Sequence, residues 1–498
     1  MRGIGLACVV AGALAIGLLS GCAVGSLDSS SGTTGTTTTT ATGPALSPAA
    51  VMDWNSIAID ASGLDSTPVA PGDDRVGGYN VGPGRASRAM AIVHIAIFEA
   101  VNAIHGGYQS YVNLEKASSS ASAEAAIATA AHDTLVALFP DQKAGMDQQL
   151  DVAIKRLGQT DAVTVGQDVG HKAAAAILAD RANDGSAKPD PHVGTDWTCS
   201  DAPGHWRPDP VSKNTVALGA YWSEVKPFVM ESASQFRCTT PPALGSQEYR
   251  DALTEAHDLG GDGITTTTKR TLTDTVVGIF WAYDAAPALC APPRLYNQIA
   301  ALIAAQKGSD MVETARLLAI VNVAMADAAI AGWESKYHYD MWRPVCAIRE
   351  IAPGTGPSGL GDGDPLDLPL ADPEFTPLGA PSSNTTKTNF TPPFPSYPSG
   401  HAAFGGALFE TLRNFYGTDD IPFDFMSDEF NGKTTDNTGQ VRPKISRHFS
   451  NLSQAEDENG QSRIYLGIHY RFDKDAGITQ GRAIADLVGK ILYPAIKN

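Results

Sequence analysis

The stretch Pro398-Ser399-Gly400-His401 combines the residue types that can hold an anion at the start of a helix. Pro398 has a fixed φ and no N–H, so it suits a helix entrance and leaves the amides that follow it free for a ligand. Free amides and the positive end of the helix dipole favour a multiply charged anion. Apolar residues at helical spacing continue until Gly417, which indicates a real helix. These four residues alone would favour an ordinary capped core helix, but two other stretches of the sequence make an oxyanion cradle the better prediction.

A second candidate stretch carries two cations, Lys336 and Arg343, seven positions apart. On a helix ending at Pro344 they share one face, so their long side chains can converge on one point. Such a pair usually marks a solvated face. Here the neighbours include Trp333 and Trp342 in an acidic chain, which favours an anion pocket.

The third stretch contains Arg463, His469 and Asp473. Because His469 and Asp473 are four apart, one helical face would let the carboxylate accept the Nδ1–H and leave Nε2 facing a metal or phosphorus centre. A core histidine bonded to a carboxylate is the common alternative. Arg463 lies about 120° round an ideal helix from His469, so it reaches the same centre only through its long side chain or a helix break.

Together, the motifs Lys-x6-Arg-Pro, Pro-Ser-Gly-His and Ser-Arg-x5-His, in this order, resemble the family that unites vanadium-dependent haloperoxidases with PAP2-type phosphatases. The likeness covers residues 333–473 and is weaker at 280–284 and 85–104. It implies an all-α fold of two related helical bundles with long irregular loops. It also implies that vanadate or phosphate oxygens are held by Lys336, Arg343, Ser399, Gly400 and Arg463.

The resemblance gives the two histidines different roles. His469 would be the axial vanadium ligand, or the nucleophile of a phosphatase, and His401 would be the acid/base. Three cations and several N–H groups can also neutralise a tetrahedral oxyanion on physical grounds alone. With vanadate as cofactor, the expected substrates are hydrogen peroxide, a halide and small organic molecules that hypohalous acid halogenates.

The neighbouring residues favour the haloperoxidase over the phosphatase. Trp333 and Phe394 look like the Trp and Phe of chloride-oxidising fungal members, and aromatic walls keep a site dry. Asp284 looks like the family's carboxylate partner of the pocket arginine, here Arg463. Chloride and bromide both remain open as substrates, as do the natural organic substrate and the oligomeric state.

Two alternative functions remain. One is an exported acid phosphatase that acts through a phosphohistidine at His469 and protonates the leaving group from His401. The other is a non-catalytic binding lipoprotein at the cell surface, which the intact set of charged residues argues against.

The N-terminus reads as an export signal over residues 1–21, with a basic residue, a short apolar run and a Leu-Ser-Gly-Cys ending. This resembles a bacterial lipoprotein signal, in which Cys22 is lipidated. Residues 22–49, rich in Ser, Thr and Gly, would form a flexible tether. We expect an exported, membrane-anchored protein in the periplasm or at the cell surface, sorted to the outer membrane if the cell has two membranes.

The folded part is expected to comprise a helical bundle at 50–215 and a catalytic helical bundle at 216–498. Residues 88–100 and 316–328 match in pattern, which favours a duplicated bundle, although alanine-rich composition alone produces some likeness. Helices are predicted by apolar spacing at 85–104, 121–138, 146–156, 167–183, 265–283, 293–305, 311–342, 462–472 and 481–492. Residues 352–395 are predicted to be a long loop that walls the pocket, and 419–453 to be irregular.

The balance of 36 basic and 54 acidic residues gives a net charge of −18 and argues against a nucleic-acid surface. Four cysteines remain after Cys8 and Cys22 are set aside, and an oxidising compartment would permit two disulfides among them. We expect Cys199 to pair with Cys238, since both lie in one irregular stretch. The other two are Cys290 and Cys346.

Overall fold

Two long apolar helices, α2 (Pro83–His105) and α9 (Met311–Tyr339), pack against each other at the centre of the fold. They contain the two stretches whose sequences match. The computed structural model describes residues 46–70, 73 and 75–496. Both helices are long and apolar enough to cross a membrane, but 94% of each apolar window is buried inside the protein. A helix that is apolar on all sides is a core helix when other helices cover it, as here.

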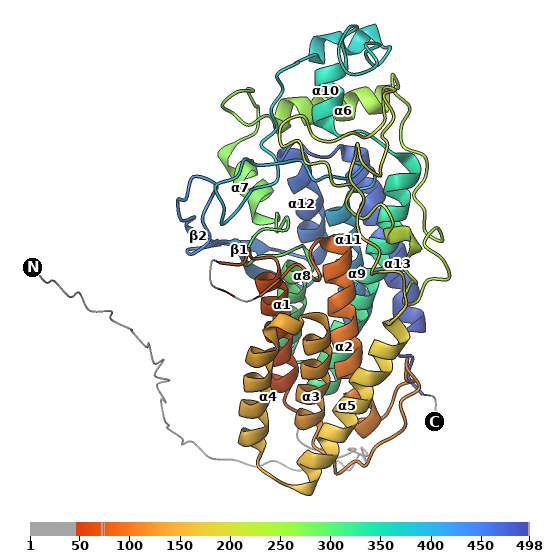
Figure 1. Cartoon of the computed structure of the whole chain (residues 1–498), viewed down its shortest axis with the longest axis vertical. Helices are drawn as coiled ribbons and strands as arrows, with labels where there is room; N and C mark the ends of the chain where they lie inside the picture. Colours follow the sequence, from red (N-terminus) through yellow and green to blue (C-terminus); the bar gives the residue numbers. More distant parts are fainter. Residues whose placement is uncertain (1–45, 71–72, 74, 497–498) are drawn as a thin grey trace, which may run out of the picture. The chain divides into compact units, whose positions relative to one another are not determined.

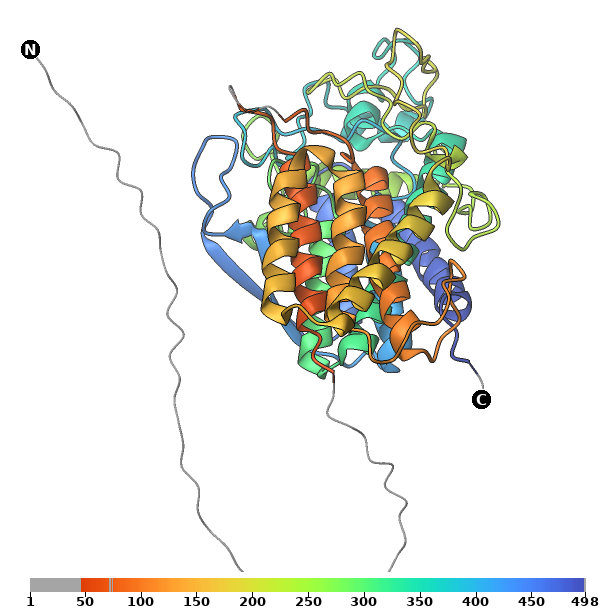
Figure 2. The same ribbon diagram turned by 60° about the horizontal axis from the view of Figure 1, so that its bottom comes forward.

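A first group of helices lies beside α2, and several of its members contact α2 directly (Figures 1 and 2). Two glycines let α5 (Asp161–Arg181) come close to α3 (Ala123–Leu138). A Cβ at Gly166 would lie 2.3 Å from the carbonyl oxygen of Ser122, and one at Gly170 would lie 2.5 Å from that of Ala126. The group comprises α1 (Ala49–Asp65), α3 (Ala123–Leu138), the short η1 (Pro140–Gln142), α4 (Lys143–Leu157) and α5 (Asp161–Arg181).

A second group contains α9, and α11 and α13 share the most extensive contact within it. Figure 1 shows α6 and α10 at the end of the molecule opposite α4 and α5. Short helices η2 (Trp222–Glu224) and η3 (Pro365–Leu370) lie in the long connections. The α-helices of this group are α6 (Gln247–Gly260), α7 (Leu272–Phe280), α8 (Pro293–Lys307), α10 (Pro344–Glu350), α11 (Gly400–Tyr416), α12 (Leu452–Tyr465) and α13 (Arg471–Ile491).

The predicted all-helical fold class is confirmed, with one small exception. Residues 419–453, predicted to be irregular, contain an antiparallel hairpin of β1 (Phe423–Asn431) and β2 (Lys444–Phe449). In β1, Phe423 and Phe425 are buried and alternate with the exposed Asp424 and Met426. This period of two was obscured by Asp and Asn, which are uncommon in strands.

Several helix boundaries differ from the prediction. Helix α9 ends at Tyr339, because Asp340 adopts the left-handed conformation with φ 51°. The predicted helix at 265–283 is shortened to α7, and the predicted helix at 462–472 is split between α12 and α13. Helices α1 and α6 were missed. The division into bundles at 50–215 and 216–498 stays a prediction; Ala45–Asn498 forms one compact unit.

The expected disulfide between Cys199 and Cys238 is wrong, because all four cysteines of the described residues are free thiols. Cys238 contacts the carbonyl oxygen of Ala476 at 3.8 Å, and Cys290 accepts a hydrogen bond from Ser62 at 2.9 Å. Sharing one irregular stretch therefore did not bring the first pair together. The expected lipidation site Cys22 lies outside the described residues, as do the predicted signal at 1–21 and most of the predicted tether at 22–49.

Candidate active site

The site lies at the start of α11, where the sequence predicted it. Ser399 is the N-cap, and its side chain accepts a hydrogen bond from the amide of Ala402. The amide of Ser399 is not free, because it donates to the carbonyl oxygen of Asp473 at 2.9 Å. The amide of Ser399 is thus engaged within the protein, contrary to the expectation that it would offer an amide to the anion, whereas its hydroxyl only accepts and keeps its hydrogen to donate. Gly400 and His401 supply the first-turn amides, which have no acceptor within the helix.

Gly400 makes room for an aromatic wall. A Cβ at this position would lie 3.2 Å from the ring of Trp333, closer than such atoms usually approach. Trp333 in turn contacts Phe394, with ring centroids 5.0 Å apart, and its indole N–H donates to the carbonyl oxygen of Leu218. The structure therefore brings the predicted Trp and Phe together beside the helix start.

Lys336 is fully buried beneath the proline-rich segment. Its ammonium group donates to the carbonyl oxygens of Pro395 at 3.0 Å, Ser396 at 2.9 Å and Pro398. Because an ammonium group has three donors, none is left for an anion in this arrangement. Burial and the neighbouring Arg343 lower the pKa of Lys336. Lys336 therefore fixes the approach to α11 and contributes charge, rather than offering the direct contact that was expected.

Arg343 reaches the site from the N-cap of α10, so the predicted helical face shared with Lys336 does not exist. Its Nε donates to the carbonyl oxygen of Phe394 at 2.9 Å and its Nη1 to that of Ile468 at 2.7 Å. Nη1 also lies 3.0 Å from Nε2 of His469. Nη2 is buried with no partner among the described residues. Burial lowers the pKa of Arg343 to about 10.

Arg463 lies in the last turn of α12 and is also fully buried. Its Nη2 donates to both carboxylate oxygens of Asp284, each at 2.8 Å, which is the pairing that the resemblance implied. Its Nε and Nη1 find no acceptor in the described part of the chain. Burial raises the pKa of Asp284, and Arg463 opposes that rise.

His469 and Asp473 form the predicted hydrogen bond, with Nδ1 2.7 Å from Oδ2, but not on one helical face. The chain breaks at Gly467, which has φ 71°, and α13 begins only after Tyr470. Asp473 stands at the third position of α13, where it also accepts hydrogen bonds from the amide of Tyr470 at 3.0 Å and the hydroxyl of Ser396 at 2.5 Å. The same break brings Arg463 and His469 to one place.

The hydrogen bond to Asp473 assigns the imidazole proton of His469 to Nδ1, so Nε2 carries the lone pair, which accepts from Nη1 of Arg343 at 3.0 Å in this structure. Burial and then Arg343 lower the pKa of His469, which keeps the ring neutral. Nε2 therefore faces the arginines as an acceptor.

His401 also lines the site, and its Nε2 lies 2.6 Å from the carbonyl oxygen of Ala282, to which it donates. Burial and the nearby Arg463 lower the pKa of His401. The ring is thus neutral and fixed by the segment that carries Asp284. Its role as acid/base stays a prediction.

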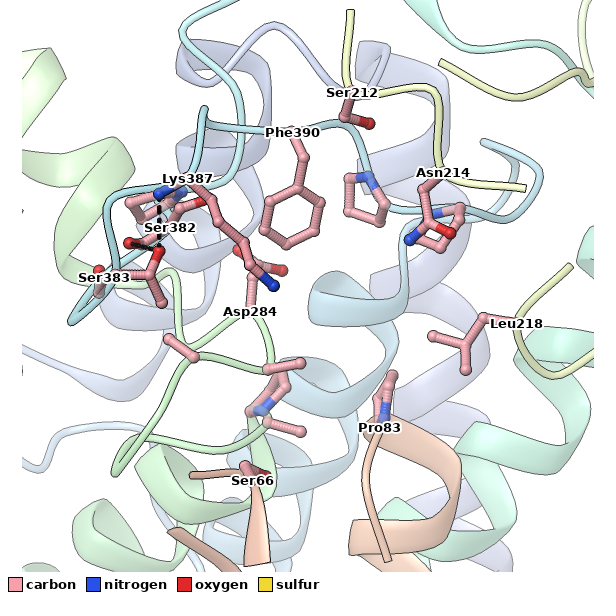
Figure 3. A pocket seen from close by; sticks show the side chains of 18 of the residues that line it. Ser66, Pro83, Ser212, Asn214, Leu218, Asp284, Ser382, Ser383, Lys387 and Phe390 are labelled. Atoms are coloured by element: carbon pink, nitrogen blue, oxygen red, sulfur yellow. Dashed lines mark hydrogen bonds between the residues drawn. The ribbon is translucent and has the colours of Figure 1, made fainter. Parts of the chain in front are cut away.

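Part of this cluster forms the floor of a cavity of about 1200 Å³, while Lys336, Arg343 and Asp473 lie behind the lining. The predicted long loop contributes a wall through residues 381–394, part of which appears in Figure 3. Among the predicted site residues, the lining includes Asp284, Trp333, Phe394, Gly400, His401, Arg463 and His469.

Two supporting residues were missed from the sequence. Ser396 holds Asp473, and the buried Glu429 accepts hydrogen bonds from Ser383 at 2.6 Å and from the amide of Tyr283 at 3.4 Å. Ser396 lies inside the proline-rich motif of the sequence, and this position could have marked it as a candidate site residue. Glu429 gave none, because it lies on a strand of the hairpin that was not predicted.

The residues at the floor fit a tetrahedral oxyanion. Arg343 and Arg463 together present three buried N–H-bearing nitrogens without partners in the described residues. Leaving such donors unpaired costs free energy unless a ligand accepts their hydrogen bonds. With the first-turn amides and Nε2 of His469, they supply donors for several oxygens and one lone pair for a central atom.

Comparisons with known proteins agree with this geometry. Residues 316–497 match the family model described as the VCPO second helical-bundle domain. The vanadium chloroperoxidase of Curvularia inaequalis is 37% identical over 294 residues, which are 51% of this chain and 46% of that protein. The chain thus spans about half the length of this relative.

Solved structures share the fold. A bacterial vanadium-dependent iodoperoxidase superposes with a TM-score of 0.69 at 23% identity, covering 91% of this chain and 98% of that one. A holo-type bacterial vanadium-dependent chloroperoxidase gives 0.62 at 16% identity, covering 84% and 93%. The family model and the sequence relative each match part of this chain, and the solved structures share its fold.

Proposed function

We propose that this protein is a vanadate-dependent haloperoxidase, which uses hydrogen peroxide to oxidise a halide to hypohalous acid that halogenates organic substrates. The observation that carries the proposal is the set of unpaired N–H groups on Arg343 and Arg463 around Nε2 of His469. A neutral imidazole surrounded by fixed cations suits a metal oxyanion, whose oxygens accept hydrogen bonds while its centre accepts a lone pair.

Each group of the chain has a distinct task. Arg343 and Arg463 bind the oxygens, and Lys336 adds charge from beneath. His469 would hold the central atom through Nε2, and His401 would take up and release a proton at Nδ1, since its Nε2 is engaged by the carbonyl oxygen of Ala282. Vanadate, when bound, supplies a Lewis-acidic centre that activates peroxide without a change of oxidation state. Trp333 and Phe394 exclude water, which strengthens the electrostatic field of the cations.

The decisive experiment loads the purified protein with orthovanadate and assays halogenation of a phenolic dye with peroxide and each halide in turn. Hydrolysis of a phosphate ester is measured before loading. We expect halide-dependent turnover that inorganic phosphate competes away. Ester hydrolysis without halogenation would instead support the phosphatase. An exposed histidine on the hairpin gives a matched control, since His448→Ala should match the wild type while His469→Ala is inactive.

We also propose that the protein is exported and anchored through a lipid on Cys22. The support is the sequence of residues 1–22, with its basic residue, apolar run and Leu-Ser-Gly-Cys ending. Metabolic labelling with a radioactive fatty acid should label the wild type, and Cys22→Ser should remove both the label and the association with membranes. Equal membrane association of the unlabelled variant would contradict the anchor.

A further inference from the structure

The cavity is far larger than the proposed reaction needs. Each oxygen of a tetrahedral oxyanion is about the size of a water molecule, whose share of liquid is roughly 30 Å³, so the whole ion fills on the order of 100 Å³. The cavity measures about 1200 Å³. Pockets for organic ligands typically measure about 300–1,000 Å³. Most of the space above the floor is therefore available to a larger molecule.

The space above the floor has a rigid apolar side, opposite a polar stretch of serine, threonine and asparagine side chains. Proline has no N–H to solvate and only one soft backbone dihedral, so a wall of prolines is pre-formed and presents carbon to the ligand. Figure 3 shows Phe390, Pro83 and Leu218 facing the cavity from three different segments. The apolar residues of this outer part are Pro68, Pro83, Leu218, Pro292, Phe390, Pro392 and Pro393.

One cation stands at the rim of this apolar space. Lys387 lies on an exposed turn of the wall, and its side chain points into the cavity in Figure 3. None of the ion pairs among the described residues involves it, although Asp284 also lines the cavity. Asp284 is instead engaged by Arg463 on both of its oxygens. An acidic group on a ligand would thus meet Lys387 without a competing carboxylate.

The turn that carries Lys387 is anchored on both sides. The side chain of Asn384 donates to the carbonyl oxygen of Pro287 at 2.8 Å and accepts from the amide of Thr435 at 3.0 Å. The hydroxyl of Ser382 closes the turn by donating to the carbonyl oxygen of Thr388 at 2.7 Å. These contacts tie the turn to the segment after α7 and to the hairpin, so the backbone of Lys387 is held in place.

We propose that the outer part of the cavity binds an organic substrate with a flat apolar body and one acidic group, placed by Lys387 and Phe390 above the catalytic floor. This inference rests on the proposed function for the chemistry that follows binding. Hypohalous acid then forms a carbon–halogen bond at an activated ring carbon. Its O–halogen bond and the ring C–H bond break, the hydroxide and the proton leave as water, and no further oxidant is needed.

Binding can be tested without turnover. The probe is 6-hydroxy-2-naphthoate, titrated by calorimetry into the vanadate-loaded protein in the absence of peroxide, and its neutral carboxamide is the matched ligand. We expect Lys387→Gln to weaken binding of the acid about fivefold, as expected for one partly solvated ion pair, and to bind the carboxamide like the wild type. Phe390→Ala should weaken both ligands. Lys433→Gln, at an exposed lysine of the hairpin connection outside the cavity lining, is the control and should change neither.

A second measurement compares products. Halogenation by the enzyme should favour one ring position more strongly than free hypohalous acid does, and Lys387→Gln should lose part of that preference. Equal affinity of the wild type for acid and carboxamide, or a product ratio identical to that of free hypohalous acid, would overturn the proposal. If the loaded wild type failed to oxidise any halide, the haloperoxidase proposal would fall, and the calorimetry alone would decide whether the outer site exists.

Discussion

Helix α12 carries two clusters of buried charge that differ in how completely they are paired. Near its start, Glu456 belongs to a network with Arg413 and Arg482. Every guanidinium nitrogen of Arg413 there has a partner, at 2.7 Å from Asp419, Glu410 and Glu456 respectively. In its last turn, Arg463 has only Asp284, and two of its nitrogens have no partner in the described structure.

The difference separates charge used for folding from charge kept for a ligand. A buried pair with all its hydrogen bonds made holds helices together, whereas an unpaired buried cation destabilises the folded protein until an anion arrives. Arg413 fastens α11 to α12, and Arg482 fastens α13 to the same carboxylate. Arg463 and Arg343 instead keep buried N–H groups without partners at the site, which lowers the stability of the folded protein. Helix α12 thus carries a charge used for folding, Glu456, and a charge kept for a ligand, Arg463, about two turns apart.

The largest expected effect tests whether the unpaired cluster exists for its ligand. We expect His469→Ala to lose vanadate retention by roughly 100-fold or more, about 2.8 kcal/mol, because the lone pair at Nε2 is removed. Vanadium retained after gel filtration, measured by mass spectrometry, provides the number. Unchanged retention would show that the ion is held elsewhere.

The second test separates the two histidines of the floor. His401→Ala should keep part of the vanadate and lose turnover, since its ring bonds to the carbonyl oxygen of Ala282 and stands beside the donors rather than among them. Retention and steady-state rate are measured on the same preparation. Equal loss of binding in the two alanine variants would refute the division of roles.

A matched pair of substitutions tests the comparison directly. Arg413→Gln leaves Glu456 short of a partner and should lower the free energy of unfolding by about 3 kcal/mol, with little change in vanadate affinity. Arg343→Met removes a cation from like-charged neighbours, which offsets part of the loss of its hydrogen bonds to the carbonyl oxygens of Phe394 and Ile468, so it should cost only about 1 kcal/mol, while vanadate affinity falls roughly 30-fold. Urea denaturation without ligand and calorimetry with vanadate measure the two quantities. The opposite pattern would reverse the assignment of the clusters.

The smallest expected effect concerns Glu429, a buried carboxylate that is paired with one cation, Arg442. It is therefore less completely paired than the network around Arg413 and more completely paired than Arg463. Burial raises the pKa of Glu429 to about 7. Because the folded-state pKa lies above the unfolded value, the wild type should lose stability as the pH rises through that range, on the order of 2 kcal/mol between about pH 5 and about pH 8.5. Glu429→Gln should flatten this difference in urea denaturation. A variant with the same pH dependence as the wild type would place the titration in another group.

Much of the site could be predicted because its residues follow each other in recognisable local patterns. The N-terminus of α11 is encoded by Pro398 to His401, and the apolar spacing of α9 and α11 gave both helices with nearly correct ends. The pairing of Arg463 with Asp284 came from the resemblance alone, since no spacing rule joins residues 179 positions apart.

The contacts that could not be predicted form where a helix ends or is interrupted. Helical spacing put His469 and Asp473 on one face, whereas the contact forms across the start of α13. The same reasoning gave Lys336 a free ammonium group, because a sequence does not show that three carbonyl groups of the proline-rich segment close around it. The hairpin was missed for a related reason, since its buried residues are few and interrupted by polar ones.

The break before α13 also joins the floor of the cavity to a distant helix. Gly467 packs directly on Gly260 at the end of α6, where a Cβ on Gly467 would come within 2.5 Å of the Gly260 carbonyl oxygen. Neither residue has a side chain, so the two backbones are in direct contact. A side chain introduced at either glycine would therefore force the two backbones apart, two residues before the imidazole of His469, so the close approach of α6 helps to set the position of that ring.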